Sequence, residues 1–182
     1  KSYCKNKISV DVDKILDLHS SLEYKILSRV GGKMSDGLLV PGKPDGMASF
    51  NNKGKTVLVR NHELRKGHGI KSSAFLNGTR EIKALGSKHY DVSAFGGTTN
   101  LVYDEKNKRV ESEFLSLSGT EANCSGGSTP WGTWLTCEES VNKKSKKEKS
   151  HGYVFEVYPN DKMNLQRAKP LKNLGRFNHE AV

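Results

Sequence analysis

A cysteine and two glutamates stand next to one another at Cys137, Glu138 and Glu139. They close a stretch, Asn123 to Glu139, that also holds both tryptophans of the chain and contains no lysine or arginine. A thiolate beside two carboxylates is electrostatically unfavourable unless a cation neutralises the group. Carboxylates suit hard ions such as calcium, whereas a thiolate suits iron or zinc. From spacing alone, two interpretations stay open: a metal site, and a buried cysteine followed by two solvated glutamates.

The segments around these residues indicate how they are positioned. Asn123 to Pro130 is rich in turn-forming residues, and Trp131 to Thr136 has the alternation of a short strand that would deliver Cys137 at its end. A second predicted strand, Thr56 to Arg60, runs into Asn61-His62-Glu63, and the same tripeptide recurs at Asn178-His179-Glu180. Repeated polar groups at strand ends are typical of repeated units that present equivalent loops, as the blades of a β-propeller do.

Short strands separated by turn signals recur along the chain, with no convincing long amphipathic helix. Met47 to Phe50 and Thr56 to Arg60 predict a hairpin, and Leu64 to Tyr90 predicts a long excursion with one helical turn. The other predicted strands include Tyr24 to Val30, Leu101 to Tyr103, Val110 to Leu117 and Gly152 to Tyr158. We therefore predict an all-β fold, a partial β-propeller comprising several blades of a larger propeller.

Composition limits the remaining possibilities. A chain of 182 residues predicts one domain over residues 1–182, and no run of about 18 apolar residues indicates a membrane span. The formal charge of +10 admits anionic partners, and part of it lies in Lys143 to Lys149. That run has no interleaved aromatic residue, so it reads as a solvated loop, and we expect no nucleic-acid partner. The three cysteines fit no disulfide framework, although Cys124 and Cys137 would be able to pair in an oxidising compartment.

Several segments together resemble the PhoX-type alkaline phosphatases, a family of iron- and calcium-dependent β-propellers. The most specific is Trp131-Gly132-Thr133-Trp134-Leu135-Thr136-Cys137-Glu138-Glu139. The others, in family order, are Met34 to Gly37 with Val40 to Gly42 and Pro44 to Met47, Val57 to Leu64, Gly96 to Thr99, His151 to Val157, and Gly175 to Val182.

The resemblance implies metal-assisted hydrolysis of phosphomonoesters for phosphate scavenging, with Fe³⁺ as Lewis acid and Ca²⁺ holding substrate and screening the carboxylates. It implies that Glu63, Cys137, Glu138 and Glu180 ligate the metal ions, and that Cys137, Glu138 and Glu180 act in catalysis through them. Glu139, Asn61 and Asn178 would support the ligands, and His62 and His179 would orient the neighbouring glutamates.

The resemblance also sets expectations for the whole protein. The chain looks like the N-terminal portion of such a domain, truncated at its C-terminal end and inactive as an isolated fragment. We expect a monomer that is periplasmic or secreted, although this chain carries no export signal. Two alternatives stay open: a metal-binding propeller acting on another substrate, and a non-enzymatic module that binds polyanions through the lysine loop.

Overall fold

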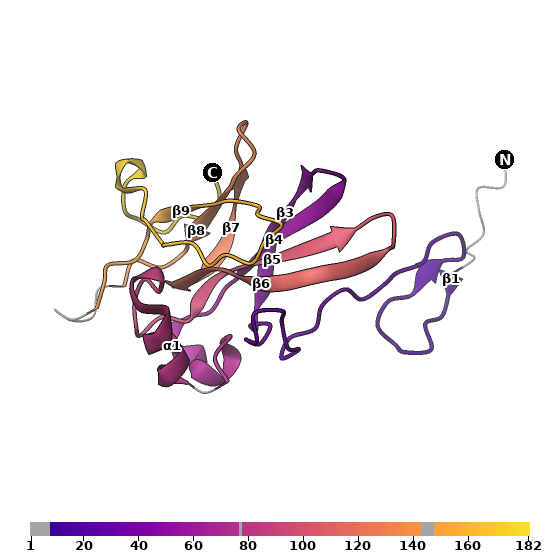
Figure 1. Cartoon of the computed structure of the whole chain (residues 1–182), viewed down its shortest axis with the longest axis horizontal. Helices are drawn as coiled ribbons and strands as arrows, with labels where there is room; N and C mark the ends of the chain where they lie inside the picture. The colour runs from indigo at the N-terminus through magenta and orange to yellow at the C-terminus, as the bar shows by residue number, and fades with distance from the viewer. Residues whose placement is uncertain (1–7, 77, 143–147) are drawn as a thin grey trace.

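A computed structural model describes residues 8–76, 78–142 and 148–182, and most of their regular secondary structure is antiparallel β-sheet (Figure 1). The predicted all-β class is confirmed. Most of the lysine loop, Lys143 to Lys147, lies outside the described residues. Within them, no helix is long and apolar enough to cross a bilayer.

The larger sheet has four strands in sequential order. They are β3 (Pro44–Asn52), β4 (Lys55–His62), β5 (Gly96–Asp104) and β6 (Arg109–Thr120). The predicted hairpin is confirmed as β3 and β4, which are joined through Lys53 and Gly54, both with positive φ. Two successive residues of positive φ form the tight turn whose twist matches that of the flanking strands. The last residues of β4 deliver Asn61 and His62 to the end of this sheet.

The smaller sheet has three strands and carries the conspicuous cysteine–glutamate stretch. They are β7 (Asn123–Ser128), β8 (Trp134–Glu138) and β9 (Val154–Val157), and an isolated bridge from Phe155 to Pro170 extends β9 outward. The prediction that Asn123 to Pro130 is only a turn is wrong, because β7 pairs with β8 across a register shift between Asn123 and Gly126. A side chain at Gly126 would collide with the carbonyl oxygen of Leu135, so glycine permits this close strand approach.

Short elements occupy the remaining chain. Among the described residues, the excursion after β4 contains one α-helix, α1 (Thr79–Leu85), and the 3₁₀ turns η1 (Lys66–His68), η2 (Ile70–Ser72) and η3 (Gly86–Lys88), and η4 (Lys172–Leu174) follows later. An N-terminal hairpin of β1 (Ile8–Ser9) and β2 (Leu18–His19) lies at the far end of the molecule from α1 (Figure 1). The predicted strand at Tyr24 to Val30 is wrong, because this segment forms no strand and pairs with none of the strands among the described residues.

One hydrophobic cluster joins the two sheets. Val59 and Leu117 of the larger sheet pack with Trp134 and Phe155 of the smaller sheet. The Trp134 indole N–H donates to the Asn61 side-chain oxygen at 2.9 Å, so this interface is also fixed by a buried hydrogen bond. These contacts fix the position of one sheet against the other, and so they also fix the positions of the polar groups at the strand ends.

His62 at the end of β4 is fully buried and neutral. Burial, and then the positive charge of Arg60, lower its pKa to about 3. Its Nδ1 lies 3.0 Å from the Gly42 carbonyl oxygen, and its Nε2 lies 3.0 Å from the Thr99 hydroxyl. Nδ1–H must donate to the carbonyl, which leaves Nε2 to accept from Thr99. His62 thus connects the loop before β3 to the larger sheet.

A neutral buried histidine makes stability depend on acid. The folded pKa lies below the ordinary value of 6.5, so the unfolded chain binds the proton first and stability falls as the pH drops below that value. Acidification from about pH 7.5 to about pH 5.5 should cost about 1 kcal/mol through His62 alone. Urea denaturation at both pH values measures this loss. The His62→Gln variant, less stable at both, should lose about 1 kcal/mol less; equal losses would refute the assignment.

Candidate metal centre

Three segments of the chain meet where β7 begins and β8 ends. They bring together the Cys124 sulfur and one carboxylate oxygen each of Glu139 and Glu180, all within 4.8 Å of one another. In the described part of the chain, no other trio of histidine, cysteine or acidic side chains is gathered this closely. Cys124 is buried, Glu139 is half-buried and Glu180 is exposed, so the group is anchored inside the fold and open on one side. We call it the thiol–carboxylate cluster.

Backbone packing places these three residues. The N–H of His179 donates to the Glu138 carbonyl at 3.1 Å, which lays the C-terminal segment against the end of β8. The Cys124 sulfur lies 3.3 Å from the carbonyl oxygens of both His179 and Glu180. On the other side, a side chain at Gly46 would sit 2.8 Å from the Cys124 carbonyl oxygen, so β3 packs directly on β7. The cluster thus lies where both sheets and the C-terminal segment converge.

Further charges surround the thiol–carboxylate cluster. The Arg65 guanidinium bridges Glu63 at 2.8 Å and Glu139 at 2.7 Å. Asp45 lies close enough to the same glutamates for their charges to affect it. Its pKa is raised mainly by desolvation, and further by the negative charges of Glu63 and Glu139. At least four carboxylates therefore share this corner, and Arg65 neutralises only part of their charge. Such a concentration of negative charge favours the binding of a cation.

Cys137 lies directly behind the cluster. It is fully buried in an apolar group with Cys124 and Val154. Burial, then the proximity of Cys124 and Glu180, raise the pKa of the Cys137 thiol to about 12, and burial raises that of Cys124 to about 11. Both cysteines are free, so the alternative of a Cys124–Cys137 disulfide is not realised. Without a cation both are neutral thiols, and binding a metal would release their protons.

Glu138 faces away from Cys137, as alternation along β8 requires. Its side chain is fully buried, and its two oxygens accept four hydrogen bonds of 2.7 to 3.1 Å. The donors are the backbone N–H groups of Glu121, Gly152 and Tyr153 and the Nδ1 of His151. Ligation of a metal ion by Glu138 would require these bonds to break.

His151 links Glu138 to Asp91, and at neutral pH its imidazole is protonated on both nitrogens and carries a positive charge. Its Nε2 lies 3.1 Å from an Asp91 carboxylate oxygen. Burial alone would lower the pKa of His151, but the hydrogen bonds that it donates to Asp91 and Glu138 outweigh this effect and raise the pKa to about 9. The result is a fully buried carboxylate–imidazolium–carboxylate chain. We call it the buried charge chain.

The predicted ligands are thus divided between two places. Glu180 is in the thiol–carboxylate cluster, Glu63 borders it through Arg65, and Cys137 lies behind it, whereas Glu138 belongs to the buried charge chain. The metal-ligand roles of all four stay predictions. Sequence alone predicted only a supporting role for Glu139, and it did not point to Cys124 as a ligand or to Arg65. The position of Arg65, two residues after Glu63, was the available signal.

The two arginines that flank the repeated tripeptides are both engaged elsewhere. Arg60 pairs with Glu113 at 2.9 Å, and Arg176 donates to the backbone carbonyls of His151 and Val141. Their side chains hold segments together, and neither is available to the thiol–carboxylate cluster in this structure.

Comparison with known proteins identifies the class. The family described as "Alkaline phosphatase PhoX" matches residues 5–182, nearly the whole chain, so the protein belongs to the PhoX alkaline phosphatase family. The resemblance carried by the stretch ending at Glu139 is thereby confirmed. No curated protein and no solved structure matches the chain.

The adjacent residues Glu138 and Glu139 provide a matched test of this geometry. Glu138→Gln leaves the buried His151 cation with a single carboxylate and should lower the free energy of unfolding by about 3 kcal/mol. Glu139→Gln removes only a partly exposed ion pair to Arg65, so it should cost less than about 1 kcal/mol. Urea denaturation of the metal-free protein measures both. Similar losses for the two variants would contradict the assignment of Glu138 to the buried charge chain.

Proposed function

We propose that the protein is a metal-dependent phosphatase that releases phosphate from phosphomonoesters and serves phosphate scavenging. Family membership supports phosphatase chemistry. The observation that carries metal dependence is the thiol–carboxylate cluster, in which a sulfur and two carboxylate oxygens lie within 4.8 Å of one another. Carboxylates this close repel one another; Arg65 offsets part of the repulsion through Glu139, and a metal ion bound by the cluster would offset the rest.

The donor set fits the two ions that the family resemblance implies. The carboxylates of Glu63, Glu139 and Glu180 are hard oxygen ligands and would hold Ca²⁺. The sulfurs of Cys124 and Cys137 would hold Fe³⁺ as thiolates. Bound metal supplies Lewis acidity toward a phosphoryl oxygen and lowers the pKa of coordinated water. Glu138, the fourth predicted ligand, would reach this set only after leaving the buried charge chain, so we assign it to holding the end of β8.

Arg65 is the residue of this chain best placed to orient the phosphate. Its side chain is 44% exposed, and it is fixed from behind by Glu63, Glu139 and the Glu139 carbonyl. A guanidinium has five N–H donors, so donors remain for phosphate oxygens after these contacts. A preorganised cation of this kind stabilises the charge that moves to the leaving oxygen. We propose Arg65 for this role, because Arg60 and Arg176 are engaged in contacts elsewhere.

We further propose that the two sheets are blades of a β-propeller within a single domain. The sequential order β3-β4-β5-β6 is that of a four-stranded blade, and the bridge from Phe155 to Pro170 places a fourth chain segment beside β7-β8-β9. Two blades do not close a propeller, so the complete ring would require more. Export to the periplasm or beyond, and a monomeric state, complete the proposal by analogy with the family.

Activity toward p-nitrophenyl phosphate tests the function. The full-length protein should hydrolyse it, excess chelator should abolish turnover, and elemental analysis should find iron and calcium. Glu180→Gln should lower kcat/KM about 100-fold through weakened metal binding, whereas Glu23→Gln, an exposed glutamate outside the cluster, should leave it unchanged. The same assay on residues 1–182 alone tests the expectation that they do not suffice. Full activity in excess chelator would refute metal dependence.

A further inference from the structure

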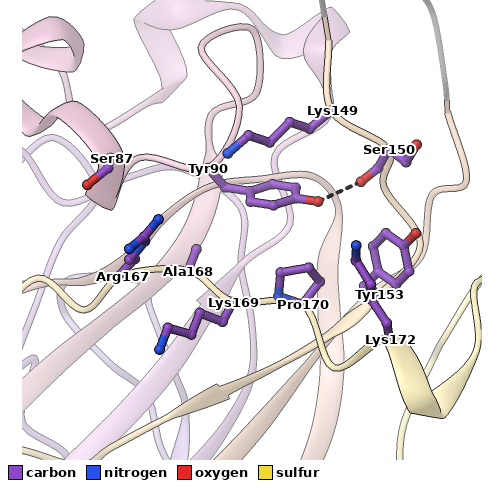
Figure 2. A pocket seen from close by; sticks show the side chains of 10 residues that line it. All are labelled: Ser87, Tyr90, Lys149, Ser150, Tyr153, Arg167, Ala168, Lys169, Pro170 and Lys172. Carbon is purple, nitrogen blue, oxygen red and sulfur yellow. Dashed lines mark hydrogen bonds between the residues drawn. The ribbon is translucent and has the colours of Figure 1, made fainter.

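A basic pocket separate from the thiol–carboxylate cluster lies on the surface between η3, the segment that precedes β9 and the segment that follows β9 (Figure 2). Its volume is about 600 Å³. Four of the ten lining residues are cations, and none is acidic: Lys149, Arg167, Lys169 and Lys172. In the salt bridges among described residues, none of these four takes part. The pocket therefore presents uncompensated positive charge.

The backbone that carries these cations is held in place. Gln166 N–H donates to the Ser116 carbonyl at 3.0 Å, and Leu171 N–H donates to the Val154 carbonyl at 2.9 Å. Between these two anchors, Ala168 is buried in the hydrophobic cluster that joins the sheets, while its neighbours Arg167 and Lys169 are exposed. The segment therefore offers two cationic side chains from a fixed frame, which reduces the ordering cost of binding an anion.

The opposite wall of the pocket is fixed by Tyr90. Its hydroxyl donates to the Ser150 carbonyl at 3.0 Å, and its ring packs edge-on against Phe155. The Lys149 ammonium lies 4.5 Å from the centre of this ring, where the aromatic face attracts it. The Lys149 backbone N–H also donates to Asp91, so the residue is tied to the buried charge chain at its base. Figure 2 shows the Lys149 amine above the Tyr90 ring, with Arg167 and Lys169 on one side.

We propose that this pocket binds a small molecule carrying two or more phosphate groups, at a site distinct from the metal-dependent one. Arginine matches phosphate oxygens with paired N–H donors, and lysines add compact point charges. Four cations exceed the requirement of one phosphate group, and the volume is that of a small-molecule site. Tyr153 and Pro170 complete the lining and give apolar surface for an attached organic group. Inorganic diphosphate and a nucleoside diphosphate share the required chemistry.

Calorimetric titration of the full-length protein with methylenediphosphonate tests the proposal, because its P–C–P link resists hydrolysis. Chelator is present throughout, so the thiol–carboxylate cluster holds no metal ion that would bind the probe. We expect binding that weakens as salt is added, and a Kd raised about tenfold or more by the double substitution Arg167→Gln, Lys169→Gln. The matched control Lys33→Gln, Lys106→Gln removes two exposed cations outside the pocket and should leave Kd unchanged.

Three results would overturn the proposal: no binding by the parent protein, equal Kd for the parent and the pocket variant, or equal weakening by the control. A parallel titration with α,β-methylene-ADP distinguishes inorganic diphosphate from a nucleoside diphosphate as the ligand. If this probe binds more tightly than methylenediphosphonate, Tyr153 and Pro170 contact an organic group. Loss of phosphatase activity plays no part in these readouts, so failure here and failure of the proposed function are separable.

Lysine protection gives an independent measurement that needs no variant, should the double substitution fail to fold. In the unmodified full-length protein, methylenediphosphonate should slow acetylation of Lys149, Lys169 and Lys172 but not that of Lys33 or Lys106. Mass spectrometry resolves each site. Equal acetylation of the two sets with and without the probe would overturn the proposal.

Discussion

The buried hydrogen bonds of Glu138 are the constraint on which the candidate site depends. One carboxylate connects the end of β8 to the turn before β7 through Glu121 and to the segment before β9 through His151, Gly152 and Tyr153. A buried carboxylate is costly unless its oxygens are fully satisfied, and a partner cation is needed as well. The protonated His151 is that cation, and Asp91 holds it from the other side. Together they fix the strand end from which the neighbouring side chains project.

The alternation of side chains along β8 determines which residues face the candidate site. Because Glu138 points into the buried charge chain, Cys137 and Glu139 on either side of it are directed to the opposite face, where Cys124 and Glu180 meet them. A single strand end thus separates the hydrogen-bonded Glu138 carboxylate from the carboxylates gathered in the thiol–carboxylate cluster. The same separation places the basic pocket on the Glu138 side, since its wall residue Tyr153 donates its backbone N–H to Glu138. Negative and positive surfaces are therefore kept apart by one strand.

Much of the fold was predictable because it follows from local signals. The β3–β4 hairpin, β5, β6, β8 and β9 all fall on stretches with β-forming residues and turn residues between them. The predictions for two segments were wrong, for opposite reasons. Asn123 to Ser128 looks like turn chemistry, but its small residues permit close pairing with β8. Tyr24 to Val30 has strand composition, yet it forms no backbone pairing with the described strands, and propensity alone does not form a sheet.

The site was predictable only to the level of which stretches contribute, because assignment within a stretch depends on which face each side chain takes. In Cys137-Glu138-Glu139, sequence adjacency makes both glutamates plausible ligands, but a strand places neighbours on opposite faces. The position of His151 decides which of the two glutamates is engaged in buried hydrogen bonds, and that contact spans thirteen residues. Cys124 was hidden for a related reason: a cysteine among turn residues carries no ligand signal until the C-terminal segment is laid against it. Tertiary contacts between distant segments, which no local pattern encodes, decide which of the chemically suitable residues can act together.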